Sequence, residues 1–130
     1  MTVLVAYVPR PEGQAALDKG IEYAKERNQP LLVVNATPGG NGDDPARADV
    51  QDVERIEQLL AQSGVKAEFK QFVRGKNAID EIAELVDLHQ VSLLVIGLRR
   101  RSPVGKLLLG SMAQEILMTI PCPILAVKAD

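Results

Sequence analysis

Short apolar runs alternate with stretches of helical periodicity along the whole chain, and this alternation limits the fold more than any other feature. Strands and helices in regular alternation are typical of a parallel sheet with right-handed crossovers. The sequence therefore predicts an α/β fold: a single three-layer domain over residues 1–130, with a five-stranded parallel sheet and four helices on both faces. The predicted strands are Val3 to Val8, Leu31 to Ala36, Val65 to Val73, Leu93 to Ile96 and Ile124 to Lys128.

The predicted strands differ in the burial that their residues indicate. Leu93 to Ile96 is apolar throughout and ends at Gly97, which is typical of a strand buried on both faces. Val65 to Val73 alternates apolar and polar residues, which indicates a half-exposed strand at a sheet edge. Ile124 to Lys128 follows Pro123, and proline is tolerated at the beginning of a strand.

The segments between these runs carry apolar residues at helical spacing, and three of the four expected helices have clear start signals. We expect the second helix to begin at Pro45 with Asp44 as its cap. Asn77 is the expected cap of the third helix, and Ser111 with Gln114 predicts a capping box at the fourth. The positions predicted to face the sheet are Ala16, Leu17, Gly20, Ile21 and Ala24 between Glu12 and Arg27; then Val50, Val53, Ile56 and Leu60; Ile79, Ile82, Ala83 and Val86; and Ala113, Ile116, Leu117 and Ile120.

Composition limits the classes of partner. A net charge of −2 gives no reason to expect nucleic acid or an anionic membrane as partner, and every apolar run is far shorter than the roughly 20 residues of a membrane helix. Two Tyr, two Phe and no Trp argue against stacking on single-stranded nucleic acid. The N-terminus lacks the pattern of a secretion signal and Cys122 is the sole cysteine, so we expect a cytoplasmic protein.

The segment from Val91 to Glu115 carries the strongest functional signal. Gly97 ends the apolar run and is followed by three arginines, Arg99, Arg100 and Arg101. Gly110 and Ser111 then precede the last helix. A strand, a glycine, a basic loop, a second glycine and a helix N-terminus bring cations and free backbone N–H groups to the carboxyl end of one strand. This order predicts a phosphate site.

The same segment resembles the nucleotide-binding signature of the universal stress protein family, which is Gly, two residues, Gly, nine residues, Gly and then Ser or Thr. Gly97, Gly110 and Ser111 match three positions, and the nine-residue gap from Arg101 to Leu109 is intact. Arg100 stands in place of the middle glycine. Elsewhere, VRGKNAIDEIAELV resembles the third strand, turn and third helix of that family, and CPILAVK resembles its last strand.

This resemblance implies a strand order of 3-2-1-4-5 and a homodimer that pairs through the last strand, Ile124 to Lys128. It also implies ATP or AMP as the ligand, with or without Mg²⁺. Val8 stands where nucleotide-binding members have Asp, and Ala36 aligns with a main-chain contact to adenine. The nucleotide-binding residues that it indicates are Val8, Pro9, Ala36, Ile96, Gly97, Arg99, Arg100, Arg101, Gly110, Ser111 and Met112.

Three functions remain open from the sequence. The first is a dimeric stress-response switch that binds an adenine nucleotide without being an enzyme. The second is a dimeric interaction module with no nucleotide, which Val8 and Arg100 favour. The third is an enzyme. The sequence supports it least, because no nucleophile, general base or set of metal ligands lies near the predicted site, and at most weak ATP hydrolysis is expected. His89 has no nucleophile partner, and Asp43, Asp44 and Asp49 match no calcium-loop spacing.

Overall fold

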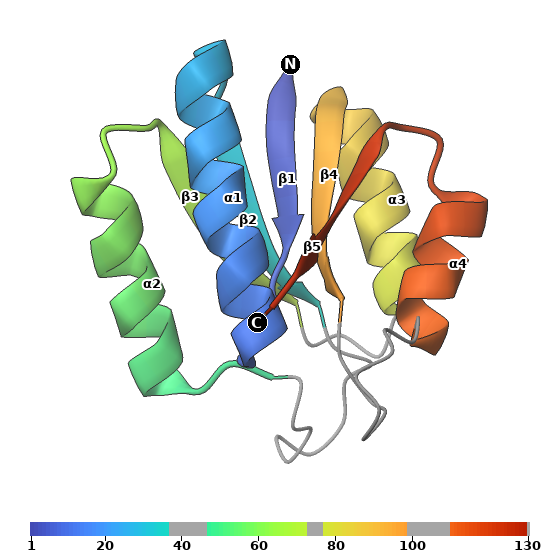
Figure 1. The fold of residues 1–130 in the computed structure, drawn as a ribbon, viewed down its shortest axis with the longest axis horizontal. Coiled ribbons are helices and arrows are strands. Elements are labelled where there is room, and N and C mark those ends of the chain that lie inside the picture. Colours follow the sequence, from blue (N-terminus) through green and yellow to red (C-terminus); the bar gives the residue numbers. More distant parts are fainter. Residues whose placement is uncertain (37–46, 73–76, 99–109, 130) are drawn as a thin grey trace.

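Strands and helices alternate along the part of the chain that the computed structural model describes, residues 1–36, 47–72, 77–98 and 110–129 (Figure 1). None of the helices in these ranges has the length and apolar character needed to cross a membrane. The elements are β1 (Thr2–Ala6), α1 (Pro11–Arg27), β2 (Leu31–Ala36), α2 (Val50–Gln62), β3 (Ala67–Phe72), α3 (Ala78–Leu88), β4 (Val91–Leu98), α4 (Ser111–Thr119) and β5 (Ile124–Lys128).

The sheet has the order β3-β2-β1-β4-β5, and every neighbouring pair is parallel. This confirms both the predicted α/β class and the order that the family resemblance implies. From β1 the chain continues to β2 on one side, whereas from β4 it continues to β5 on the other side. The adjacent strands β1 and β4 therefore form the switch point of the topology, where ligands of open α/β sheets collect. All five strands run downward in Figure 1, so their carboxyl ends lie at its lower edge.

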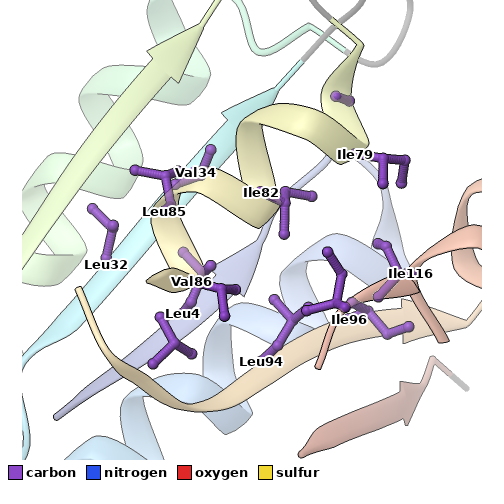
Figure 2. Packing of buried hydrophobic residues seen from close by; sticks show 13 residues of the cluster. Leu4, Leu32, Val34, Ile79, Ile82, Leu85, Val86, Leu94, Ile96 and Ile116 are labelled. Atoms are coloured by element: carbon purple, nitrogen blue, oxygen red, sulfur yellow. The ribbon is translucent and has the colours of Figure 1, made fainter. Parts of the chain in front are cut away.

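Two apolar clusters fill the space on either side of the sheet. Side chains alternate along a strand, so Leu93 and Val95 of β4 join the cluster under α1 and α2, which includes Leu17 and Ile56. Leu94 and Ile96 join the opposite cluster under α3 and α4. Figure 2 shows this second cluster, with Ile82 and Ile116 beside Ile96. Each fully buried aliphatic side chain contributes about 1.5–3 kcal/mol.

Helix α1 lies unusually close to the strands that it covers. A Cβ atom added at Gly20 would lie 2.2 Å from Cγ2 of Val5, and one added at Gly13 would lie 1.8 Å from the carbonyl oxygen of Val8. Both glycines are buried in the first two-thirds of the helix. The backbone of α1 therefore packs directly against β1 and the residues just beyond that strand.

The helix starts differ from two of the three predictions. Asn77 caps α3 as predicted, because its Oδ1 accepts a hydrogen bond from the N–H of Ile79 at 2.8 Å. Helix α2 begins at Val50 and not at Pro45, since residues 47–49 are not helical. Its cap is Asp49, in a reciprocal capping box with Asp52. The predicted cap Asp44 lies outside the described residues.

The fourth helix also begins one residue earlier than predicted. Ser111 is already the first residue of α4, and the N-cap is Gly110, which has no side chain to form a cap. The predicted N-cap at Ser111 is therefore wrong, whereas the side-chain bonds of the predicted capping box with Gln114 lie outside what the structure describes. As the N-cap, Gly110 offers no side chain to the amide groups of the first turn of α4.

Two residues that were predicted to face the sheet are exposed. Val50 is the first residue of α2, and because helical side chains lean toward the N-terminus, it has no preceding turn beside the sheet to pack on. Leu117 is on α4, which precedes the edge strand β5, and the sheet of the described residues has no strand beyond β5. Its neighbour Ile116 is buried, as is Ile120 directly after the helix.

The close packing of α1 predicts that Gly20→Ala destabilises the protein, although alanine is the better helix former. Alanine gains about 1 kcal/mol of helix propensity, but overpacking against a stiff, buried Val5 costs about 1–3 kcal/mol. We expect a net loss of about 1 kcal/mol in the free energy of unfolding, measured by urea denaturation.

The matched control is Ala61→Gly on the exposed side of α2, which changes only helix propensity and should lose about 1 kcal/mol. An increase in stability for Gly20→Ala would show that α1 does not lie as close to β1 as described.

Candidate functional site

A cavity of about 240 Å³ opens where β1 and β4 end side by side. Its position at the topological switch point is the usual place for a ligand in this architecture. The volume is close to the lower end of the roughly 300–1,000 Å³ typical of small-molecule sites. The residues that line it are Ala6, Tyr7, Val8, Arg10, Glu12, Val34, Ile82, Ile96, Gly97, Leu98, Gly110, Met112, Ala113 and Ile116.

The inner wall of the cavity is apolar. Val34, Ile82, Ile96 and Ile116 are all buried members of the core cluster under α3 and α4. Figure 2 shows Ile96 and Ile116 near each other and Val34 on the other side of Ile82. Ala113 adds a small side chain from α4. Such a wall can take up a flat aromatic ring, because contact with it removes apolar surface from water.

Two helix N-termini contribute to the same cavity, and neither N-cap residue supplies a side-chain cap. The N-cap of α1 is Arg10, and the N-cap of α4 is Gly110; neither makes a side-chain hydrogen bond to its first turn. Helix N-termini carry free N–H groups and a partial positive charge. The outer part of the cavity is therefore suited to an anionic group.

The two glycines of the cavity wall have different physical roles. A Cβ atom added at Gly97 would lie 2.2 Å from the carbonyl oxygen of Glu12, so this glycine permits the close packing of α1 on β4. A Cβ atom added at Gly110 would meet no atom of the described residues within 4 Å. The backbone at Gly110 has φ −68° and ψ 163°, which any residue adopts. Neither this backbone geometry nor packing against the described residues therefore requires glycine at position 110.

Two charged residues of the wall have no partner among the described residues. The guanidinium of Arg10 and the carboxylate of Glu12 form neither an ion pair nor a side-chain hydrogen bond there. Arg10 is half-buried and Glu12 is buried. The cavity thus presents one cation and one anion that are both available to a ligand.

A buried amide fixes the strand ends beneath the cavity. Asn35 of β2 is fully buried; its Nδ2 donates to the carbonyl oxygen of Tyr7 at 3.0 Å, and its Oδ1 accepts from the N–H of Ala48 at 2.8 Å. Gln71 of β3 donates to both Asn35 Oδ1 and the carbonyl oxygen of Ala48. We call this group the Asn35 clamp. It joins β1, β2 and β3 to the segment that precedes α2.

Tyr7, one residue beyond β1, is held from its other end as well. Its hydroxyl accepts a hydrogen bond from Nη2 of Arg55 at 3.0 Å, and Nη1 of Arg55 donates to Gln14 at 2.7 Å. Burial raises the pKa of the Tyr7 phenol above its usual value, whereas Arg55 acts in the opposite direction. The phenol of Tyr7 therefore stays neutral at ordinary pH. Because Tyr7 is held at both its carbonyl and its hydroxyl, its role is to fix this part of the cavity wall.

The structure brings five of the predicted nucleotide-binding residues to the cavity: Val8, Ile96, Gly97, Gly110 and Met112. Pro9 lies between β1 and α1 and Ala36 ends β2, but neither lines the cavity. Ser111 is the first residue of α4. The predicted phosphate contacts of Arg99, Arg100 and Arg101 fall outside the described residues and stay predictions.

Sequence reasoning did not identify Arg10 and Glu12 as cavity residues. Their position in the sequence could have indicated it, since Arg10 and Glu12 alternate with Pro9 and Pro11 directly after the first predicted strand. His89 lies at the C-terminal end of α3, and its Nε2 is buried without a hydrogen-bond partner. Among the described residues, no group of three or more His, Cys, Asp or Glu side chains could hold a metal ion.

The fold and the cavity define the class of the protein: an open, doubly wound parallel α/β fold with a cavity at its switch point. A family model described as "Universal stress protein family" matches residues 1–128, and the chain belongs to this family. It is 47% identical over 126 residues to a universal stress protein of Mycolicibacterium smegmatis, with 97% of this chain and 96% of the relative covered.

Solved structures show the same fold. A universal stress protein of Archaeoglobus fulgidus superposes with a TM-score of 0.78 at 28% identity, covering 98% of this chain and 97% of that chain. A structure of the universal stress protein from the same organism in complex with dAMP gives a TM-score of 0.72 at 22% identity, covering 98% and 96% of the two chains.

The Asn35 clamp predicts a pH-dependent loss of stability in Asn35→Asp. The side chains have the same shape, but a carboxylate cannot donate to the carbonyl of Tyr7 and would face it with a negative charge. Only the protonated acid can donate, so the folded state raises the pKa of this group above its unfolded value of about 3.9. The loss should therefore be small below pH 4 and grow to about 3 kcal/mol at pH 7.

The measurement is urea denaturation of both proteins at pH 4 and pH 7. Gln62→Glu makes the same neutral-to-acid change at an exposed position and should show little pH dependence. An equal loss for Asn35→Asp at both pH values would contradict the clamp.

Proposed function

We propose that this protein is a cytoplasmic, homodimeric switch of the stress response that binds an adenine nucleotide, ATP or AMP, and catalyses no reaction on it. Family membership supports the stress-response role. The related structure in complex with dAMP, which shares the fold, supports an adenine nucleotide as the ligand class. The cavity at the switch point of β1 and β4 is the site that we assign to it.

The observation that carries the proposal is the open space at Gly110. This glycine lines the cavity and is the N-cap of α4, although its backbone suits any residue and an added Cβ would meet no atom of the described residues. An Asp, Asn or Ser would cap the helix better. Glycine offers no side chain to the amide groups of the first turn, and we infer that a phosphate group of the ligand binds them.

The rest of the cavity fits the remaining parts of a nucleotide. The apolar wall of Val34, Ile82 and Ile96 suits the adenine ring. Arg10 supplies a cation that can bind phosphate oxygens in a bidentate manner. We expect Arg99, Arg100 and Arg101 to add further cations, with Ser111 at the start of α4 beside the phosphates, and Mg²⁺ to enter only as the counterion of ATP.

The described part of the cavity wall does not favour catalysis. Its polar side chains are those of Tyr7, Arg10 and Glu12. Tyr7 is engaged with Arg55, and neither of the other two is paired with a nucleophile in the described wall. Binding would instead change the charge and the packing at the N-termini of α1 and α4, and this is the signal that a switch requires.

Because the N-cap of α4 is a glycine, we expect Gly110→Asp to keep or raise the stability of the protein while it lowers the affinity for nucleotide. Aspartate is favoured at the N-cap and at the positive end of a helix, so the free energy of unfolding should stay equal or rise by a few tenths of a kcal/mol. The new carboxylate occupies the amides and repels phosphate, so affinity for ATP and AMP should fall at least about tenfold. Isothermal titration calorimetry with and without Mg²⁺ measures the affinity.

Lys66→Gln is the matched control. It changes the net charge by the same amount at the opposite edge of the sheet, before β3, and should leave affinity unchanged. If the wild-type protein binds neither ATP nor AMP, the proposal is wrong, and the interaction module without nucleotide becomes the better description.

We propose that the homodimer forms through β5. This strand is at the edge of the sheet, and the neighbouring Met118 of α4 is 87% exposed. An unpaired strand edge beside an exposed apolar side chain favours pairing with a second copy. The other edge strand, β3, carries Glu68 and Lys70, which are charges of the kind that discourage pairing.

A lysine in the middle of β5 should therefore prevent assembly. Ala126 is exposed, so Ala126→Lys should leave the fold intact, while two copies paired across a twofold axis would bring like charges together. Sedimentation velocity should show a dimer for the wild-type protein and a monomer for this variant. Ala61→Lys on α2 should remain dimeric; loss of the dimer in both variants would point to a nonspecific effect and contradict the assignment.

A further inference from the structure

Glu12 is a buried carboxylate that the fold leaves without a partner. Its residue exposure is only 9%, and its side chain has no ion pair or hydrogen bond among the described residues. In the described ranges, His89 Nε2 is the one side-chain polar atom that is both sealed and unbonded. Glu12 is one of the residues that line the cavity.

The chemistry of a carboxylate limits what this part of the cavity can bind. An ionised carboxylate only accepts hydrogen bonds, and burial without a partner costs free energy. Its position in the first turn of α1 offsets part of that cost through the helix dipole. A ligand group beside Glu12 must therefore bring O–H or N–H donors, and a phosphate would be repelled there.

The position of Glu12 in the cavity indicates which part of a bound nucleotide would lie beside it. Its main chain packs against Gly97, one residue beyond Ile96 of the apolar wall. The uncapped amides of α4 begin at Gly110, on a different element of the same cavity. A nucleotide with its ring on the apolar wall and its phosphate at Gly110 has its sugar between these two regions, and the sugar hydroxyls are donors.

We propose that Glu12 accepts hydrogen bonds from the ribose hydroxyls and makes the cavity selective for ribonucleotides over 2′-deoxyribonucleotides. This inference rests on the proposed nucleotide binding and adds a specificity residue to it. A hydrogen bond to a charged acceptor is stronger than a neutral one. The wild-type protein should therefore bind AMP at least about tenfold more tightly than 2′-deoxy-AMP.

The test compares the ratio of these two affinities between variants by isothermal titration calorimetry. Glu12→Met keeps the length of the side chain and removes the acceptor, so the ratio should fall to within about twofold, while Glu12→Gln should give an intermediate ratio. The matched control is Glu81→Gln. Glu81 is 7% exposed and also in the first turn of its helix, but it does not line the cavity.

The possible results separate the two proposals. Equal affinity of the wild-type protein for AMP and 2′-deoxy-AMP, with binding still lost in Gly110→Asp, would overturn the role of Glu12 and leave nucleotide binding in place. If Glu12→Met leaves the ratio of the affinities for AMP and 2′-deoxy-AMP unchanged but changes both affinities, Glu12 does not recognise the ribose. It would then affect binding only through its charge or its role in the fold, which would overturn the proposal. No binding of AMP to the wild-type protein would overturn both proposals.

Discussion

The close contact between α1 and the sheet sets the geometry of the candidate site. Gly13 and Gly20 allow the helix backbone to lie on β1 and the residues just beyond it, and Gly97 allows β4 to lie against the start of the same helix. A methyl group at any of the three positions would require the helix to move. Because α1 is held this closely, its N-terminus, with Arg10 and Glu12, is fixed at the mouth of the crevice between β1 and β4. The positions of the polar groups in the site therefore follow from the packing of α1 on the sheet.

The Asn35 clamp holds the strand ends on the other side of that crevice. Parallel strands end in loops whose backbone groups need partners, and here one buried amide satisfies the carbonyl of Tyr7 and the N–H of Ala48. A buried polar network of this kind is stabilising only when every member is satisfied. The clamp therefore fixes the position of Tyr7 in the cavity wall.

Periodicity and family resemblance together predicted the five strands, their order and most of the helix faces, because these depend on repeated apolar positions. The start of α2 could not be predicted in the same way, since Asp44 and Asp49 are equally good caps by residue type. In the structure the cap is Asp49, which forms a reciprocal capping box with Asp52. Gly110 was predicted from the glycine signature, and Val8 was predicted from the family resemblance at the end of the first strand. Arg10 and Glu12 could not be predicted, because charged residues beside prolines resemble a solvated loop. Asn35 did give a local signal, as the one strongly polar residue in the run LLVVNA.

The cavity wall contains the apolar Val8 together with two charged residues, Arg10 and Glu12. Val8 removes an acidic side chain at the end of β1, and from the sequence alone this favoured a cavity without a nucleotide. The structure places the carboxylate of Glu12 in the same wall, in the first turn of α1. Arg10 and Glu12 have only Pro11 between them, yet they form no ion pair with each other. Glu12 is buried and Arg10 is half-buried, and pairing them would lower the cost of burial. The proposed nucleotide would supply a partner to each of them, with its phosphate beside Arg10 and its ribose hydroxyls beside Glu12.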